Sequence, residues 1–204
     1  EQQKSMVEQN PETIMYRENL AQTYYENGMY EKAVKQFKTI TEKNPEDILT
    51  LEKLADSYEK LSKWNLAIDV YKQILSVEPD NKKNLCRLSQ TYTETGRYTQ
   101  ARRQANKALE IDPDYGLAHI SKGMVYETAA DRVVDNKQDG EVKYTDKLVY
   151  KLAYDQFRKA TEDISWRAEA QRHIEYLKNL IPTEDDYFMH NDDTTIKGDH
   201  YSWI

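Results

Sequence analysis

Small and large residues recur along the first half of the chain at spacings of one, three and four positions. Such spacings place side chains on one face of an α-helix. Two of these patterns make up a block, and Gly28 and Gly96 lie between them in the first and third blocks, where a tight turn needs a residue that tolerates positive φ. The repeated positions, block by block, are Leu20, Ala21, Tyr24, Ala33, Phe37 and Ile40; Leu54, Ala55, Tyr58, Ala67, Tyr71 and Ile74; and Leu88, Ser89, Tyr92, Ala101, Ala105 and Ala108. Each block is therefore predicted to fold as two antiparallel helices.

The blocks have a fixed length. Four of the five prolines, Pro11, Pro45, Pro79 and Pro113, follow one another at exactly equal intervals. A fixed period of roughly 20 to 50 residues is the signature of a repeat array. Proline ends the second helix of each block, because it cannot continue a helix and restricts the residue before it. One helix pair cannot bury its apolar face alone, so neighbouring blocks are predicted to stack.

In this register the chain resembles the tetratricopeptide-repeat family, of the bacterial type. The family pattern of a large residue, Leu, Gly or Ala, Tyr, a turn Gly, Ala, Phe or Tyr, Ala and Pro is matched across residues 12–113. The resemblance implies an all-α fold, a right-handed α-solenoid of antiparallel helix pairs whose first helices line a concave groove. The activity that it implies is the binding of a partner protein or peptide. Repeats are predicted at 12–45, 46–79 and 80–113.

The first residues do not form a complete block. Residues 1–11 fit the end of a block whose start is absent, so they are predicted to be a partial repeat or an N-terminal cap. The first interpretation implies a longer parent protein. The chain opens without methionine, and no apolar run approaches the ~18 residues that span a membrane. The missing methionine indicates either a processed N-terminus or a sequence that begins late. We expect a soluble protein, and the sequence leaves the cytoplasm and the periplasm open as compartments.

A fourth repeat is predicted at 114–163, but its second half is displaced. Gly123 and Tyr126 fall on schedule, whereas the next Ala–Phe–Ala set, at 153, 157 and 160, comes later than the period predicts. The extra segment, about 129–147, is polar and contains Gly140. It is predicted to be a surface loop, with the first helix prolonged to about Val134. The alternative is a partner-specific finger, because insertions in repeats map to loops on one face.

The end of the chain departs from the repeat altogether. Residues 164–181 are predicted to form one amphipathic helix that caps the last open face of the solenoid. Residues 182–204 form a tail that mixes acids with large rings, which a purely disordered segment would lack. The alternatives are that the tail folds back on its own array, binds a partner or stays free. The first is favoured, with the fourth repeat or the convex face as the docking surface, and with Tyr187, Phe188, Tyr201 and Trp203 as the docking residues.

Composition and charge limit the classes of ligand that the chain is expected to bind. Of the 204 residues, 38% are hydrophobic and 32% are charged, which suits a stack that buries one narrow seam. Residues 183–204 contain six acids and one lysine, so the tail carries −5 of the formal net charge of −7. There is no basic stripe, and nucleic acid is not expected as a ligand. A helical repeat that binds RNA is therefore disfavoured.

The residue types that most often serve in catalysis or metal binding, Cys and His, are scattered along the chain. The single cysteine, Cys86, fits a small packing residue better than a nucleophile. None of the four histidines has a His or Cys partner at metal-ligand spacing, and His190 with Asp192 and Asp193 fits a solvated turn better than a cation site. No phosphate-binding loop, nucleophile elbow or zinc-protease motif is present. No catalytic, cofactor or metal site is predicted, and the chain is not expected to be an enzyme.

The resemblance places the partner-binding residues on the first helix of each repeat. In the family, four positions of that helix face the groove; here they include Met15 and Leu49 in the first two repeats. In one subgroup, two Lys, two Asn and one Arg of the groove bind a chaperone's C-terminal carboxylate. Only Lys83 and Arg87 match that set, so this ligand is rejected. The candidate groove residues are Glu18, Gln22, Tyr25, Glu52, Asp56, Glu59, Lys83, Arg87, Gln90, Ile120 and Met124.

The groove is acidic over the first two repeats and more apolar over the fourth. One interpretation is a solvated surface; the other is a groove for a basic or mixed basic–apolar segment, steered by the acids. We therefore expect a non-enzymatic scaffold or assembly subunit that binds another protein through the groove, the tail or both. The alternative is a helper domain of a larger enzyme or transport complex. The sequence does not indicate an oligomeric state.

Overall fold

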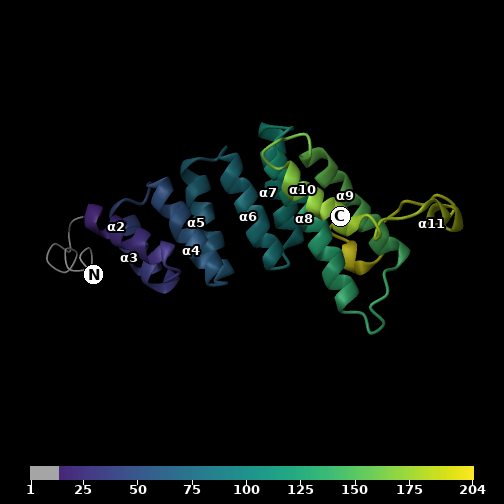
Figure 1. The fold of residues 1–204 in the computed structure, drawn as a ribbon, viewed down its shortest axis with the longest axis horizontal. Helices are drawn as coiled ribbons and strands as arrows, with labels where there is room; N and C mark the ends of the chain where they lie inside the picture. Colours follow the sequence, from purple (N-terminus) through teal and green to yellow (C-terminus); the bar gives the residue numbers. More distant parts are fainter. Residues whose placement is uncertain (1–13) are drawn as a thin grey trace. The chain divides into compact units, whose positions relative to one another are not determined.

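The computed structural model describes residues 14–204, which contain helices, turns and irregular segments but no strand. The predicted partial repeat or cap at 1–11 lies outside the described residues, as do the first two residues of the repeat predicted at 12–45. The chain divides into two compact units, one that ends at Pro79 and one that spans Asp80–Ile204. Figure 1 shows the helices in sequence colours.

Unit 1 consists of two helix pairs. Helices α2 (Ile14–Glu26) and α3 (Tyr30–Lys43) pack on each other, as do α4 (Ile48–Lys60) and α5 (Trp64–Val77), and α3 also packs on α4. Alanines at the contacts let the helices approach closely, and larger side chains fill the space around them. The fully or almost fully buried residues of this core include Ala21, Ala33, Phe37, Ile40, Leu51, Ala55, Ala67, Tyr71 and Ile74.

The turn inside each of the first three helix pairs has the same backbone conformation. Gly28 and Gly96 adopt φ values of 71° and 72°, and Ser62 adopts 54° at the corresponding position of the second repeat. Glycine reaches this left-handed region without a steric cost, whereas a side chain makes it unfavourable by about 1 kcal/mol or more. The second repeat therefore keeps the turn despite its residue type, because the packed helices on both sides fix it.

Local hydrogen bonds mark where the helices begin and end. The Asp47 and Asn81 side chains, at corresponding positions of successive repeats, accept bonds from the backbone N–H groups of Thr50 (3.2 Å) and Asn84 (3.0 Å) at the starts of α4 and α6. Such bonds satisfy N–H groups that have no partner within the helix. Helices α3, α5 and α7 each end two residues before a proline, so the prolines recur with the same period as the helix pairs.

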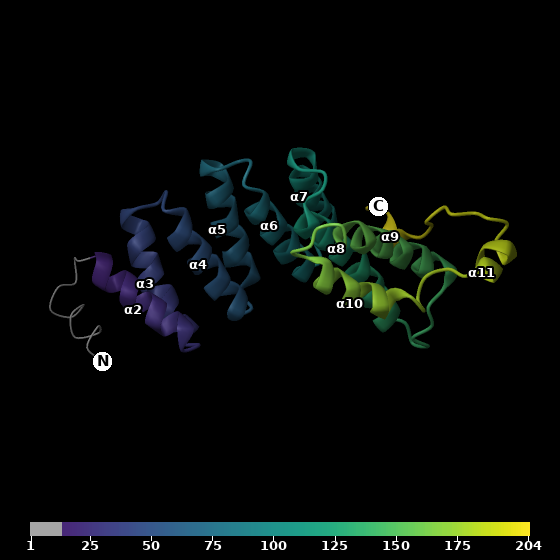
Figure 2. The same ribbon diagram turned by 45° about the horizontal axis from the view of Figure 1, so that its top comes forward.

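Unit 2 begins with α6 (Lys82–Glu94) and α7 (Tyr98–Ile111) and continues with α8 (Gly116–Asp135), α9 (Tyr144–Ala160) and α10 (Arg167–Leu177). Helix α8 packs on α6, α7 and α9, and α9 packs on α10. The short helix α11 (Glu184–Met189) and a 3₁₀ turn, η1 (Asp199–Tyr201), follow. In both ribbon views α11 lies beyond the ends of α8 and α9 (Figures 1 and 2).

The inserted segment is mostly helical. The predicted extension of the first helix to about Val134 agrees with α8, but the surface loop predicted over the rest of about 129–147 is shorter than expected. Helix α8 continues to Asp135 and α9 already begins at Tyr144, which leaves only residues 136–143 between them. Burial favours the extension of α8, since Ala129 and Ala130 are at most 2% exposed. The start of α9 is fixed by Asp146, whose carboxylate accepts a bond from the backbone N–H of Lys143 at 2.8 Å.

Helix α10 is shorter than the capping helix predicted at 164–181. Ile164, which the prediction included, lies outside the helix and is 80% exposed. Ala170 and Leu177 are fully buried against a core that includes Phe157 of α9. The ring of Phe157 stacks on His173 of α10, with 4.2 Å between the ring centroids. Helix α10 therefore covers the apolar face that α9 would otherwise expose.

Candidate partner-binding surfaces

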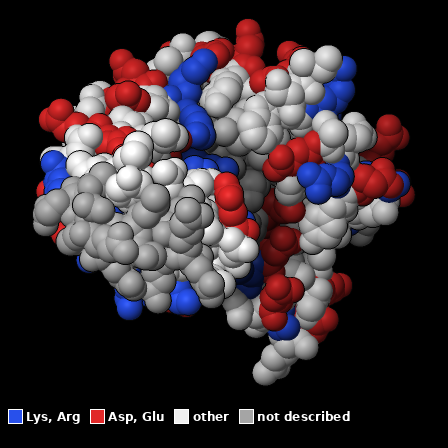
Figure 3. Space-filling view, turned by 60° about the vertical axis from the view of Figure 1, so that its left-hand side comes forward, with Lys and Arg blue, Asp and Glu red and all other residues white. Residues whose placement is uncertain are grey.

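The predicted groove residues of unit 1 lie on corresponding faces of α2 and α4. Glu18, Gln22 and Tyr25 follow one another along α2, and Glu52, Asp56 and Glu59 do so along α4. The Tyr25 hydroxyl donates a hydrogen bond to the Asp56 carboxylate, and Lys53 Nζ lies 4.9 Å from the centroid of the Tyr25 ring. These contacts hold the two faces side by side. Figure 3, in which the left-hand side of Figure 1 comes forward, shows acidic side chains along the middle of the view.

The same surface of unit 1 presents large apolar side chains. Met15 is 57% exposed and Leu49 is 69% exposed, and they lie one turn before Glu18 and Glu52 on the same helices. Glu18 is exposed, whereas the other five candidates are half-buried. The amide of Gln22 donates to Glu26 at 2.7 Å, which is a contact within α2. Acidic and apolar groups are therefore combined on one surface.

The predicted groove residues of unit 2 are only partly accessible. Lys83 and Arg87 are exposed on α6, and the amide of the half-buried Gln90 donates to Ser121 Oγ of α8 at 3.1 Å. Ile120 is 0% exposed, so its prediction as a partner-binding residue is wrong. The cause is the position of α8 among α6, α7 and α9, which leaves this helix little open surface. Met124 is half-buried and packs against the core of unit 2.

Cys86 is fully buried on α6. Burial disfavours the charged thiolate and raises the pKa of the thiol to about 12, although Ser121, Arg87 and Lys82 act in the opposite direction. A thiol of this kind reacts slowly, since the thiolate is the nucleophile. We expect no labelling of the folded protein by a thiol reagent at neutral pH and full labelling in denaturant. Rapid labelling of the folded protein, followed by mass spectrometry, would contradict this expectation.

The last residues of the tail lie on α7 and α8. The Trp203 ring stacks on Tyr126, with centroids 5.8 Å apart, and lies tilted against Tyr98 at 5.3 Å. The Arg102 guanidinium lies 5.6 Å from the Trp203 ring centroid. Arg102 Nη1 also donates to the Ile204 carbonyl at 2.5 Å. The large aromatic area buried here and the charge-assisted bond hold the end of the tail on unit 2.

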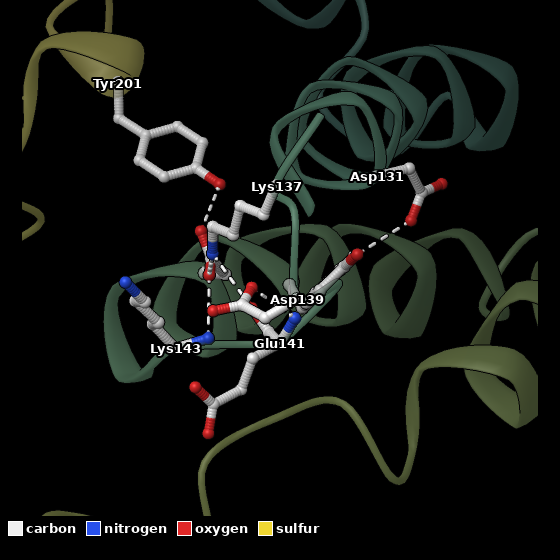
Figure 4. Close-up of polar contacts among 8 residues, drawn as sticks. Asp131, Lys137, Asp139, Glu141, Lys143 and Tyr201 are labelled. Carbon is white, nitrogen blue, oxygen red and sulfur yellow. Dashed lines mark hydrogen bonds and ion pairs between the residues drawn. The ribbon is translucent and has the colours of Figure 1, made fainter. Parts of the chain in front are cut away.

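Tyr201 joins the tail to the inserted segment through one buried carboxylate (Figure 4). Its hydroxyl donates to Asp146 Oδ1 at 2.7 Å, and Asp146 is 2% exposed. Lys137 forms an ion pair with the same carboxylate, and its ammonium also donates to the Glu141 carbonyl at 3.0 Å. Burial, together with the adjacent carboxylate, raises the pKa of Tyr201, so its hydroxyl stays a donor at physiological pH.

A second polar cluster lies nearby on α8. Asp131 accepts hydrogen bonds from the hydroxyls of Tyr150 on α9 (2.8 Å) and Tyr176 on α10 (3.0 Å). Burial raises the pKa of Asp131, and the two hydroxyl donors oppose that change. The carboxylate joins three helices, and the nearby acids Glu127 and Asp135 also raise its pKa. We interpret it as a structural contact.

The other two predicted docking residues lie on α11. Tyr187 is half-buried with its ring edge-on to Tyr144 of α9, at 6.3 Å and 88°. Phe188 is 84% exposed, so its prediction as a docking residue is wrong. It lies on the side of α11 that faces away from α9. The sequence shows the aromatic character of the tail but not which ring faces inward.

Sequence reasoning missed Asp146, Lys137 and the Tyr98–Tyr126 surface as the tail's contacts. Tyr98 and Tyr126 do occupy recognisable aromatic positions of the repeat, so a signal was present, but it indicated packing only.

The described part of the chain contains no group of three or more His, Cys, Asp or Glu side chains that could hold a metal ion. His190 instead stacks on Tyr144 at 3.8 Å. Among residues 14–204, no helix is both long enough and apolar enough to cross a membrane.

Two family profiles match the sequence. The tetratricopeptide-repeat profile matches residues 60–122, and the profile of anaphase-promoting complex (cyclosome) subunit 3 matches residues 4–74. No curated protein matches the chain significantly. With the helix pairs described above, these matches support a tetratricopeptide-repeat protein, and they confirm the predicted all-α solenoid class.

Solved structures of repeat proteins resemble the fold. A tetratricopeptide-repeat protein from Parabacteroides merdae is 16% identical with a TM-score of 0.57, over 93% of this chain and 78% of that chain. MamA from Desulfovibrio magneticus is 15% identical with a TM-score of 0.55, over 82% and 94%. The Sgt2 repeat domain from Aspergillus fumigatus is 22% identical with a TM-score of 0.51, over 75% and 87%. Such identities show the fold alone, and this fold is in general a scaffold for protein–protein interaction.

Proposed function

We propose that this chain is a non-enzymatic scaffold that binds a basic or mixed basic–apolar segment of a partner protein on the α2 and α4 surface of unit 1. The observation that supports this proposal is the combination of exposed Met15 and Leu49 with acidic residues on the same two helix faces. Single exposed apolar residues are ordinary on protein surfaces, but here they accompany acids at regular helical spacing. A partner with alternating cationic and apolar side chains would contact both kinds of group.

The two kinds of contact have different roles. The acids would steer a cationic partner and increase its rate of association, and this effect weakens as salt screens the charges. Burial of Met15 and Leu49 would supply affinity that depends less on salt. The Tyr25–Asp56 contact holds α2 and α4 in place before binding, so little ordering entropy is lost on association.

Charge reversal on α4 is expected to weaken such binding. The probe is a labelled synthetic peptide of alternating Lys and Leu, titrated by fluorescence anisotropy, with a Glu–Leu peptide for comparison. In the variant Glu52→Lys/Asp56→Lys, we expect affinity for the Lys–Leu peptide to fall roughly tenfold or more, because like charges then face each other. Glu18→Lys should act in the same direction while it leaves the Tyr25–Asp56 contact intact.

The matched control is Glu31→Lys/Glu42→Lys on α3, which changes the net charge equally. Glu31 and Glu42 are exposed on the second helix of the repeat, away from the proposed surface. Equal loss of affinity in the control and in the α4 variant would show a general charge effect and would contradict the proposed surface. Equal binding of the two peptides would contradict a basic partner.

A further inference from the structure

The short helix α11 is firmly attached to α9. Lys147 Nζ donates to both oxygens of Asp186, at 2.8 and 2.7 Å, and these bonds together with the Thr183 N–H hold the pKa of that carboxyl at about 2. The His190 ring stacks on Tyr144, whose hydroxyl donates to the Asp193 carbonyl at 3.0 Å. These contacts fix α11 against α9, although α11 contains only six residues.

The attached side of α11 leaves its opposite side open. Asp186, Tyr187 and His190 lie on the side of α9, while Phe188 and Met189 are 84% and 76% exposed. Glu184 and Asp185 lie one turn before these two residues and are also exposed. We call the four residues Glu184, Asp185, Phe188 and Met189 the α11 tip. An exposed aromatic side chain and an exposed thioether on a helix fixed in this way are typical of a surface that binds another protein.

A basic surface on α7 complements the α11 tip. Arg103 and Lys107, one turn apart, are both exposed, and neither forms an ion pair within residues 14–204. They line a surface cavity of about 390 Å³ together with Thr99, Arg102, Asn106 and Glu110. We call the surface around this cavity the α7 groove.

We propose that the α11 tip of one chain docks in the α7 groove of a second copy of this chain. The two acids of the tip carry charge opposite to that of the two cations of the groove, Arg103 and Lys107, which lie one helical turn apart. The Phe188 ring can lie against a guanidinium and the aliphatic stems of the basic side chains, which is a favourable arrangement for an aromatic ring. This assembly goes beyond the proposed binding of a partner by unit 1.

The contact must form between chains. In both ribbon views α7 and α11 lie at opposite sides of unit 2, so an α11 tip does not reach the groove of its own chain (Figures 1 and 2). The contact joins two different surfaces of two copies, which makes it heterologous. A heterologous contact leaves one tip and one groove open at the ends, so further copies add until a ring closes.

Sedimentation velocity of the full chain tests the proposal. We expect the average mass to rise with protein concentration at an ionic strength of ~0.1 M and to return toward that of one chain at ~1 M, where the Debye length shrinks to about 3 Å. Phe188→Ala should weaken the association roughly tenfold or more, as expected for a central aromatic contact. A chain that stays single at both salt concentrations would overturn the proposal and leave a different protein as the partner of the α11 tip.

Two charge-reversed variants make the test specific. Glu184→Lys/Asp185→Lys carries a basic tip and a basic groove, and Arg103→Glu/Lys107→Glu carries an acidic tip and an acidic groove. Each variant alone is expected to stay a single chain, because tip and groove then repel. An equimolar mixture is expected to associate like the native protein, since each tip then meets a groove of opposite charge. A mixture that does not associate would overturn the proposed pairing.

The control variants change net charge by the same amount as the two test variants but at other sites. Glu42→Lys/Glu46→Lys and Lys35→Glu/Lys38→Glu change exposed residues of unit 1 by the same charge and should associate like the native protein. Loss of association in these variants would assign the effect to net charge and contradict the role of the α11 tip. Circular dichroism confirms folding, and none of the substituted side chains belongs to the core. Glu52→Lys/Asp56→Lys should also associate normally, which separates this proposal from peptide binding by unit 1.

Discussion

Replacement of Asp146 by alanine is expected to lower the free energy of unfolding by about 3 kcal/mol or more and to release the end of the tail. The carboxylate is 2% exposed and is bound by Lys137, by the Lys143 backbone N–H and by the Tyr201 hydroxyl. Its removal leaves a largely buried ammonium and a buried hydroxyl without their acceptor. That cost exceeds the net value of any one of the three contacts.

Urea denaturation and limited trypsin digestion measure the two effects. Lys197 precedes the docked residues and is exposed, so cleavage after it releases residues 198–204. We expect faster cleavage in Asp146→Ala than in the native chain. Tyr201→Phe removes one hydrogen bond, keeps the ring, and should cost only about 1 kcal/mol. Asp139→Ala is the control, because this exposed residue of the same segment accepts a bond from the Glu141 N–H at 3.0 Å and does not contact the tail. Unchanged stability and cleavage in Asp146→Ala would contradict this account.

The repeated part of the fold could be read from the sequence because its determinants are local. Gly28 and Gly96 provide the turn conformation directly, and the prolines end the second helices at a fixed period. Ser62 shows the limit of such rules, since it adopts φ of 54° without being glycine. Neighbouring repeats are similar enough that the packed helices impose the turn on a residue that does not favour it.

The contacts of the tail and of the inserted segment could not be read in the same way. Asp146 looks like one acid among many in a polar stretch, and only the folded chain brings Tyr201, 55 residues away, onto it. Ile120 occupies a groove position of the repeat, yet α8 is surrounded by α6, α7 and α9 and buries it. Phe188 and Trp203 are both aromatic residues of the tail, but Phe188 is exposed while Trp203 packs against two tyrosines. These differences arise from tertiary packing, which no local pattern encodes.

Phe157→Ala is expected to destabilise unit 2 by about 3 to 5 kcal/mol, the usual cost of truncating a buried phenylalanine. Phe157 is 0% exposed and joins α9 to α8 and to α10, where His173 stacks on it. The chain offers the same substitution at an exposed site: Phe188→Ala should change stability by only about 0.5 kcal/mol or less. Urea denaturation followed by tryptophan fluorescence compares the two, because Trp166 packs against the same core. Equal effects at both sites would contradict the burial shown here.

A second substitution tests the geometry of this core. A Cβ atom added to Gly123 would lie 2.7 Å from the Phe157 ring, so Gly123→Ala alone should destabilise the native protein by about 1 to 3 kcal/mol through overpacking. In the Phe157→Ala background the ring is absent, and the methyl group then fills part of the cavity and favours helix α8 over glycine. The effect of Gly123→Ala should therefore change sign between the two backgrounds. Equal destabilisation in both backgrounds would show that Gly123 does not contact Phe157, and a double-mutant cycle measures the difference directly.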